Sequence, residues 1–187
     1  MRELEADLLE WFDDKLAKNG LAQEAIATKN ARLLFGLAAE SCVGIRETGG
    51  NNNGPMVRLL QKTIGGAVKE PWCMSFVQSC LAYAEAKTGE KSPVIASEHC
   101  QTVWTETPRS QRVKTAPLKY AIVIWAYEGT SSGHTGVVVE SFYPKKFHSV
   151  EGNTGDDGGR DGDCVTYKKR DWVRSGKLRV LGFLKPF

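Results

Sequence analysis

The 187-residue sequence lacks several features that mark whole classes of protein. No apolar run reaches the roughly 18–20 residues that a membrane-spanning helix requires, which excludes an integral membrane protein. The opening residues, MRELEADLLEWFDDKL, are acidic and amphipathic. They lack the basic start, apolar core and small-residue cleavage site of a secretory signal peptide. We therefore expect synthesis in the cytoplasm without such a signal.

Cysteine pairs at metal-ligand spacing are also missing. The five cysteines are an odd number and contain no CxxC pair; they are Cys42, Cys73, Cys80, Cys100 and Cys164. In a chain without a secretion signal this favours reduced thiols over a disulfide framework. The three histidines do not combine with cysteines at zinc-site spacing. We expect neither a metal nor a cofactor.

Neither sign of charge is in large excess, since the net charge is only +3. Its distribution is uneven, because residues 167–187 carry seven basic side chains against Asp171 alone. This end is either a solvated surface or a contact for an anionic polymer such as nucleic acid, anionic lipid or bacterial cell wall. No recognised nucleic-acid motif accompanies it, so we do not expect nucleic acid as a partner.

Two hydrophobic periods divide the chain. Leu4, Leu8, Phe12 and Leu16 predict an amphipathic helix over residues 2–18 that stops at Asn19-Gly20. After about residue 115 the pattern changes to short strands. The expected helices lie at about 30–42, 56–64 and from 72 onward, and the expected strands at 121–127, 135–142, 146–152, 164–170 and 179–185. This order predicts an α+β fold, with helices packed on an antiparallel sheet. We expect residues 1–30 to form a helical extension and 31–187 the main domain.

Cys73 is the strongest candidate for a reactive group. It follows Pro71-Trp72 and falls in the first turn of a predicted helix. Free backbone N–H groups and the helix dipole favour a thiolate there, and the same N–H groups can hold an oxyanion. Cys80 lies seven residues on, in the apolar stripe of the same helix, and is expected in the core.

The sequence SSGHTGVVVE places His134 where a flexible loop enters an apolar strand. This position suits a general base that stays partly accessible. The next strand ends in VEGNTG, where Glu151 and Asn153 are two residues apart and face the same way if the strand continues. An antiparallel turn near Pro144 brings one of them close to His134, where a carboxylate or amide would orient the imidazole.

These motifs resemble the CHAP family of cysteine- and histidine-dependent amidohydrolases and peptidases that cut peptidoglycan. PWCMSFV is followed 61 residues later by GHTGVVV and then by VEGN, and RETGGNNNGP and RVLGFLKP are also similar to phage-encoded and bacterial members. The resemblance covers roughly residues 35–187. It implies a papain-like fold of the CHAP and NlpC type, with Cys73 as nucleophile, His134 as base and acid, Glu151 orienting His134, and Asn153 as a further polar residue.

The resemblance also implies the substrate class. Bacterial peptidoglycan is the expected partner of a monomeric enzyme resembling a phage endolysin, acting on the wall after holin-dependent release. It cuts either the muramoyl–L-alanine amide or a stem or cross-bridge peptide bond. Trp72, Glu47 and Asn53 are candidates for substrate contact in the cleft. The acidic loop 155–163 departs from an EF-hand pattern and is expected to flank substrate rather than hold calcium.

Two alternatives keep the same core or the same scaffold. One is an interbacterial toxin effector, which would be encoded beside an immunity gene instead of a holin. The other is a non-catalytic wall-binding or virion protein, which the joint presence of Cys73, His134 and Glu151 disfavours.

Overall fold

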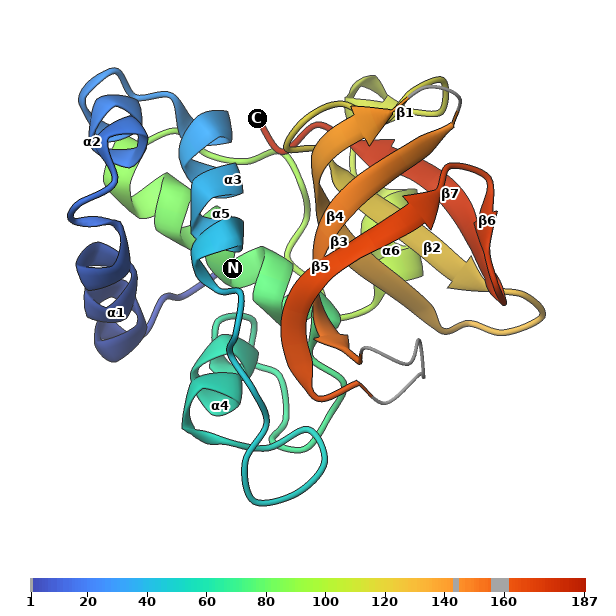
Figure 1. Cartoon of the computed structure of the whole chain (residues 1–187), viewed down its shortest axis with the longest axis horizontal. Helices are drawn as coiled ribbons and strands as arrows, with labels where there is room; N and C mark the ends of the chain where they lie inside the picture. The colour runs from blue at the N-terminus through green and yellow to red at the C-terminus, as the bar shows by residue number, and fades with distance from the viewer. Residues whose placement is uncertain (1, 143–144, 156–161) are drawn as a thin grey trace.

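The computed structural model describes residues 2–142, 145–155 and 162–187. Within these ranges the helices come first along the chain and the sheet second, as Figure 1 shows. The helices are α1 (Ala6–Leu16), α2 (Gly20–Ala27), α3 (Ala31–Ser41), α4 (Pro55–Lys62), α5 (Cys73–Thr88) and α6 (Cys100–Glu106), followed by a 3-10 turn, η1 (Arg109–Gln111).

All strand pairs in the sheet are antiparallel. The strands are β1 (Arg112–Val113), β2 (Ile122–Tyr127), β3 (Gly133–Phe142), β4 (Lys146–Thr154), β5 (Cys164–Asp171), β6 (Arg174–Ser175) and β7 (Leu178–Leu184). Their order is β1-β7-β2-β3-β4-β5, and β6 pairs with β7. The predicted α+β class and the antiparallel sheet are confirmed.

The helical part of the chain differs from the sequence prediction at three points. Asn19 does end the first helix, but its side chain also accepts a hydrogen bond from the Ala22 N–H and so caps a second helix, α2, that we did not expect. Helix α6 was also missed, because its seven residues are too few to show a clear helical period. The first helix is shorter at both ends than the predicted range 2–18.

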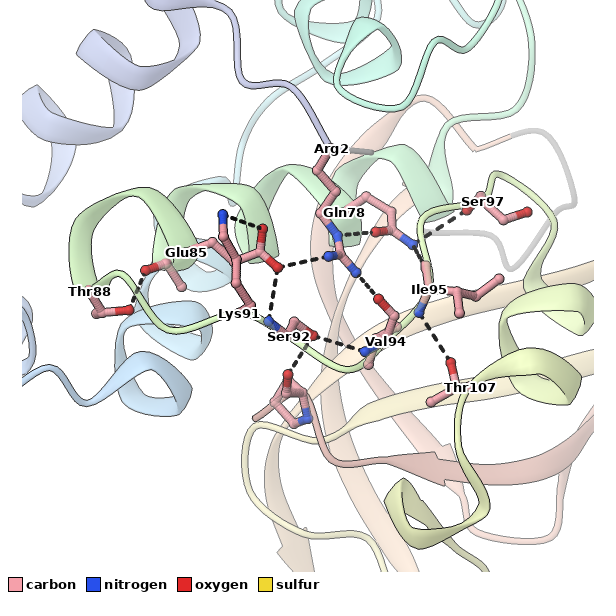
Figure 2. A network of polar contacts seen from close by, with 12 residues as sticks. Arg2, Gln78, Glu85, Thr88, Lys91, Ser92, Val94, Ile95, Ser97 and Thr107 are labelled. Atoms are coloured by element: carbon pink, nitrogen blue, oxygen red, sulfur yellow. Dashed lines mark hydrogen bonds and ion pairs between the residues drawn. The ribbon is translucent and has the colours of Figure 1, made fainter.

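Helix α5 lies between the N-terminal helices and the sheet (Figure 1), packing on α3 from one side and on β3 and β4 from the other. It is therefore buried on nearly all sides, and its polar side chains need partners inside the protein. Figure 2 shows one such set, in which the Arg2 guanidinium bonds Gln78 and Glu85 of α5 and the Val94 carbonyl. Because both faces are buried, burial on α5 extends well beyond the predicted single apolar stripe and includes polar side chains.

The N-terminal segment shares the core of the main body. Leu8, Phe12 and Leu16 belong to the same buried cluster as α5. The Phe12 ring stacks on Tyr83 at 4.7 Å between centroids, and the Tyr83 hydroxyl donates to Asp13 at 2.9 Å. These contacts join residues 1–30 to the rest of the chain. The division of the chain into a helical extension (1–30) and a main domain (31–187) stays a prediction. Across the described ranges, no helix is both long and apolar enough for a membrane crossing.

Candidate active site

Cys73 is the first residue of α5. Pro71 disfavours helical backbone for the residue before it, and Trp72 is the N-cap, so the helix starts directly at the cysteine. The thiol is 7% exposed and lines a cavity of about 310 Å³. The cavity wall consists of Glu70, Pro71, Cys73, Glu98, His99, Cys100, Tyr127, Ser131, Ser132, Gly133, His134 and Asn153. The start of α5 is thus open to a small cavity whose lining is both polar and apolar.

His134 comes from β3, which the sheet holds beside β2. Its register partner is Trp125, and the imidazole stacks on that indole at 5.6 Å between centroids and 25° between planes. The ring nitrogen Nε2 lies 2.9 Å from Glu151 Oε2. Because an ionised carboxylate only accepts hydrogen bonds, Nε2 is the donor, and Nδ1 is left for the sulfur of Cys73. The imidazole is therefore fixed both by stacking and by a carboxylate.

Glu151 on β4 is completely buried, yet it is surrounded by donors. Ser149 Oγ donates to Oε1 at 2.6 Å, and Arg170 Nε donates to the same oxygen at 2.8 Å. A second guanidinium nitrogen of Arg170 bonds Oε2, so the contact is bidentate. Arg170 also lies 5.4 Å from the Trp125 ring centroid. One indole thus packs against both the histidine and the arginine that contact this carboxylate.

These contacts set the charges in the site. Burial raises the pKa of Glu151, but hydrogen bonds from Arg170 and His134 outweigh it and lower the pKa to about 2. Burial lowers the pKa of His134, while its contacts with Cys73 and Glu151 raise it to about 9. The pKa of Cys73 is well below its usual value, chiefly through a hydrogen bond from Cys100 and further through His134 and the Met74 N–H, against the effect of burial. The resting pair is a thiolate beside an imidazolium.

Asn153 turns away from the direction that strand alternation predicted. Its φ is 53°, and the β4–β5 register shifts between Glu151 and Thr154, so the strand does not continue regularly. Its Oδ1 accepts from the Trp72 N–H at 3.2 Å, which fixes the N-cap of α5. A Cβ at Gly152 would lie 2.9 Å from Phe76 Cβ, so the glycine lets β4 approach the helix closely. Asn153 lines the cavity but supports the cysteine helix, and Glu151 alone of the two contacts His134.

Hydrogen bonds within the protein engage the three residues expected to contact substrate, Trp72, Glu47 and Asn53. Trp72 is completely buried, and its Nε1 donates to Glu47 Oε1 at 2.8 Å. Glu47 Oε2 accepts from the Asn52 N–H at 2.7 Å, and Asn53 accepts from Arg58 Nε at 2.9 Å. A buried indole has no surface left for a sugar or a D-amino acid. Trp72 is therefore a core residue and does not contact substrate, whereas substrate contact by Glu47 and Asn53 stays a prediction.

Several residues of the site were not found from the sequence. Cys100 Sγ lies 4.0 Å from Cys73 Sγ, although the two residues are 27 positions apart. Arg170 reaches Glu151 from the next strand, and Glu98 and His99 line the cavity from the segment before α6. Burial, and then Glu70 beside it, raises the pKa of Glu98. Alternate residues of a strand face the same side of the sheet, and this rule could have placed Arg170 on the side of β5 that faces Glu151. No sequence pattern near Cys100 indicates that it lies beside Cys73.

No group of three or more His, Cys, Asp or Glu side chains that suits a metal is found in residues 2–142, 145–155 and 162–187. Most of the acidic loop 155–163 lies outside the described residues, so the prediction about calcium there stays a prediction. Its described member Asp163 makes an exposed ion pair with Arg46 at 3.0 Å.

Comparison with protein-family models gives no match for this chain, and comparison with curated protein sequences gives none either.

Proposed function

We propose that this protein is a cysteine-dependent peptidoglycan hydrolase of the CHAP type, which cleaves an amide bond of the cell-wall peptide. The observation that carries the proposal is that Cys73 and His134 line the same cavity, with Glu151 hydrogen-bonded to the imidazole. A thiolate, a base that can become an acid, and a carboxylate that orients it are the parts that acyl transfer requires.

The proposed reaction begins with attack of the Cys73 thiolate on an amide carbonyl. Backbone N–H groups at the start of α5 stabilise the oxyanion, because the first turn of a helix leaves them without carbonyl partners. His134 gives its proton to the leaving amine and the C–N bond breaks, which leaves a thioester on Cys73. His134 then accepts a proton from water, the hydroxide cleaves the thioester, and the carboxylic acid product departs.

Arg170 has a supporting role in this scheme. A carboxylate buried without a cation would be protonated, and a neutral Glu151 could not stabilise the imidazolium. The bidentate contact from Arg170 keeps Glu151 charged whether or not His134 carries its proton. The pair therefore gives His134 a fixed orientation throughout the cycle.

The fold and the cavity are consistent with the proposed class. A helix that begins with the cysteine packs against an antiparallel sheet that supplies the histidine and the carboxylate, and this packing supports the proposed papain-like fold. The cavity lining also includes two serines and two glutamates, Ser131, Ser132, Glu70 and Glu98. These groups can bond the amides and ammonium groups of a stem peptide.

The test is turbidity loss of purified sacculi with the full chain and with Cys73→Ala. We expect lysis by the wild type and none by the variant, while its binding to sacculi and its melting temperature are retained. Cys80→Ala is the matched control, since Cys80 lies in the same helix but is buried away from the cavity, and it should lyse. Unchanged lysis by Cys73→Ala would refute the nucleophile. Absence of lysis by wild type on sacculi of all the main wall chemotypes would refute the function.

Mass spectrometry of the released fragments then identifies the bond. Peptides with a new N-terminal L-alanine, freed from intact glycan, indicate an amidase. Cuts inside the stem or the cross-bridge indicate an endopeptidase.

A further inference from the structure

A second thiol faces the same cavity as Cys73. Cys100 begins α6, lines the cavity wall, and is 5% exposed. Its sulfur lies 4.0 Å from that of Cys73, and no step of the proposed hydrolysis forms or breaks a covalent bond at Cys100. A disulfide needs the two sulfurs about 2.05 Å apart, so closing the gap takes about 2 Å of movement, within the range of side-chain rotation.

We propose that Cys73 and Cys100 form a site of reversible oxidative modification, at which a hydroperoxide converts the two thiols into an intramolecular disulfide. The sulfur of Cys73 attacks the peroxide; an S–O bond forms, the O–O bond breaks, and hydroxide leaves. Cys73 is then a sulfenic acid, oxidised by two electrons, and the peroxide is reduced. The sulfur of Cys100 attacks that of Cys73; the S–S bond forms, the S–O bond breaks, and the departing hydroxide takes the Cys100 proton as water.

The two sulfurs are chemically unequal, as this sequence of steps requires. The contact with Cys100, together with His134, holds the pKa of Cys73 well below its usual value. The contact with Cys73, followed by burial, raises the pKa of Cys100. The proton of the pair therefore resides on Cys100, and Cys73 is the thiolate that reacts with peroxide. Cys100 keeps a proton to give to the hydroxide that leaves in the second step.

The remaining cysteines provide an internal comparison. Cys42 and Cys80 also contact each other, but both are completely buried, and burial raises the pKa of Cys80 well above its usual value. Cys164 is buried and its thiol donates to the Thr154 carbonyl. None of these three is among the residues that line the cavity, so we expect them to react with peroxide more slowly than Cys73.

The position of Cys100 is built into the fold. The segment before α6 is held on α5 by Gln78, whose Nε2 donates to the Ile95 carbonyl at 2.9 Å, and by Arg2, which bonds the Val94 carbonyl (Figure 2). This anchoring keeps Cys100 beside the start of α5. A disulfide there leaves Cys73 without a thiolate to attack the amide, so hydrolysis stops. This consequence, unlike the modification itself, rests on the proposed function.

The experiment treats the reduced full chain with hydrogen peroxide and follows intact mass and the peptide map. We expect the wild type to lose two hydrogen atoms, with one cross-linked peptide joining Cys73 to Cys100, and dithiothreitol to restore the starting mass. Cys100→Ser should instead gain oxygen atoms on Cys73. Once Cys73 has passed from the sulfenic to the sulfinic acid, dithiothreitol should no longer restore the starting mass. Cys80→Ser is the matched control and should still form the Cys73–Cys100 cross-link.

Two results would overturn the proposal. One is oxidation of Cys73 in the wild type to the sulfinic acid as fast as in Cys100→Ser; the other is a cross-link between different cysteines. Lysis measured in parallel should be lost on oxidation and recovered with dithiothreitol in wild type but not in Cys100→Ser. A protein that forms the disulfide but never lyses sacculi would separate the two proposals, refuting the hydrolase and supporting the modification site.

Discussion

Glu151 should give this protein a steep loss of stability in acid. Its pKa is lowered from 4.5 to about 2 in the folded state because Arg170 and His134 outweigh the cost of burial. A carboxyl group shifted downward stabilises the fold fully above its unfolded pKa, and the contribution disappears as the pH falls from 4.5 through about 2. A shift of this size corresponds to about 3 kcal/mol of unfolding free energy, or roughly a 300-fold change in the folded-to-unfolded ratio.

The perturbation that isolates this contribution is Glu151→Gln, which keeps the shape of the side chain and removes its charge. Urea unfolding above pH 4.5 should show the variant less stable than wild type by about 3 kcal/mol. The gap should narrow as the pH falls toward 2, because the wild-type carboxyl then becomes neutral as well.

Glu140→Gln is the matched control. Glu140 lies on β3 with 61% of its side chain exposed, and its loss should change the unfolding free energy by less than about 0.5 kcal/mol at every pH. A gap between wild type and Glu151→Gln that stays constant from pH 6 to about 2.5 would refute the assignment of the acid sensitivity to Glu151. A variant as stable as wild type at neutral pH would refute the charge network itself.

Gly36→Ala should destabilise the fold by at least about 2 kcal/mol, because the new Cβ would lie 2.1 Å from the Tyr120 ring; Gly20→Ala, with nothing within 4 Å, should not lower the melting temperature. Arg2→Met leaves Glu85 buried without its guanidinium and should cost about 3–5 kcal/mol in urea unfolding; an unchanged midpoint would contradict the contact in Figure 2. The rate of lysis should fall as the pH rises through about 9, where His134 loses its proton; a flat profile would exclude it as the general acid.

The sequence determined the parts of this protein that depend on neighbours along the chain. Hydrophobic period separates the helical first half from the strands after residue 115, and that order predicts the observed α+β class. The same local reasoning put Cys73 at a helix start, because Pro71 prevents an earlier one, and put His134 where a glycine-rich loop enters a strand. The strand patterns on either side of Pro144 were enough to predict the pairing of β3 with β4, which brings Glu151 or Asn153 close to His134; the structure has Glu151 there.

Tertiary structure decided the contacts that no local pattern encodes. Cys100 meets Cys73 only because the segment before α6 folds back on α5, and Arg170 meets Glu151 only because β5 lies beside β4. A register shift after Glu151 turned Asn153 toward the helix start, where strict alternation had it facing His134. Trp72 is buried because β4 approaches the helix at Gly152. Local propensities act within a few residues, whereas burial and ion pairing depend on which elements the packed core brings together.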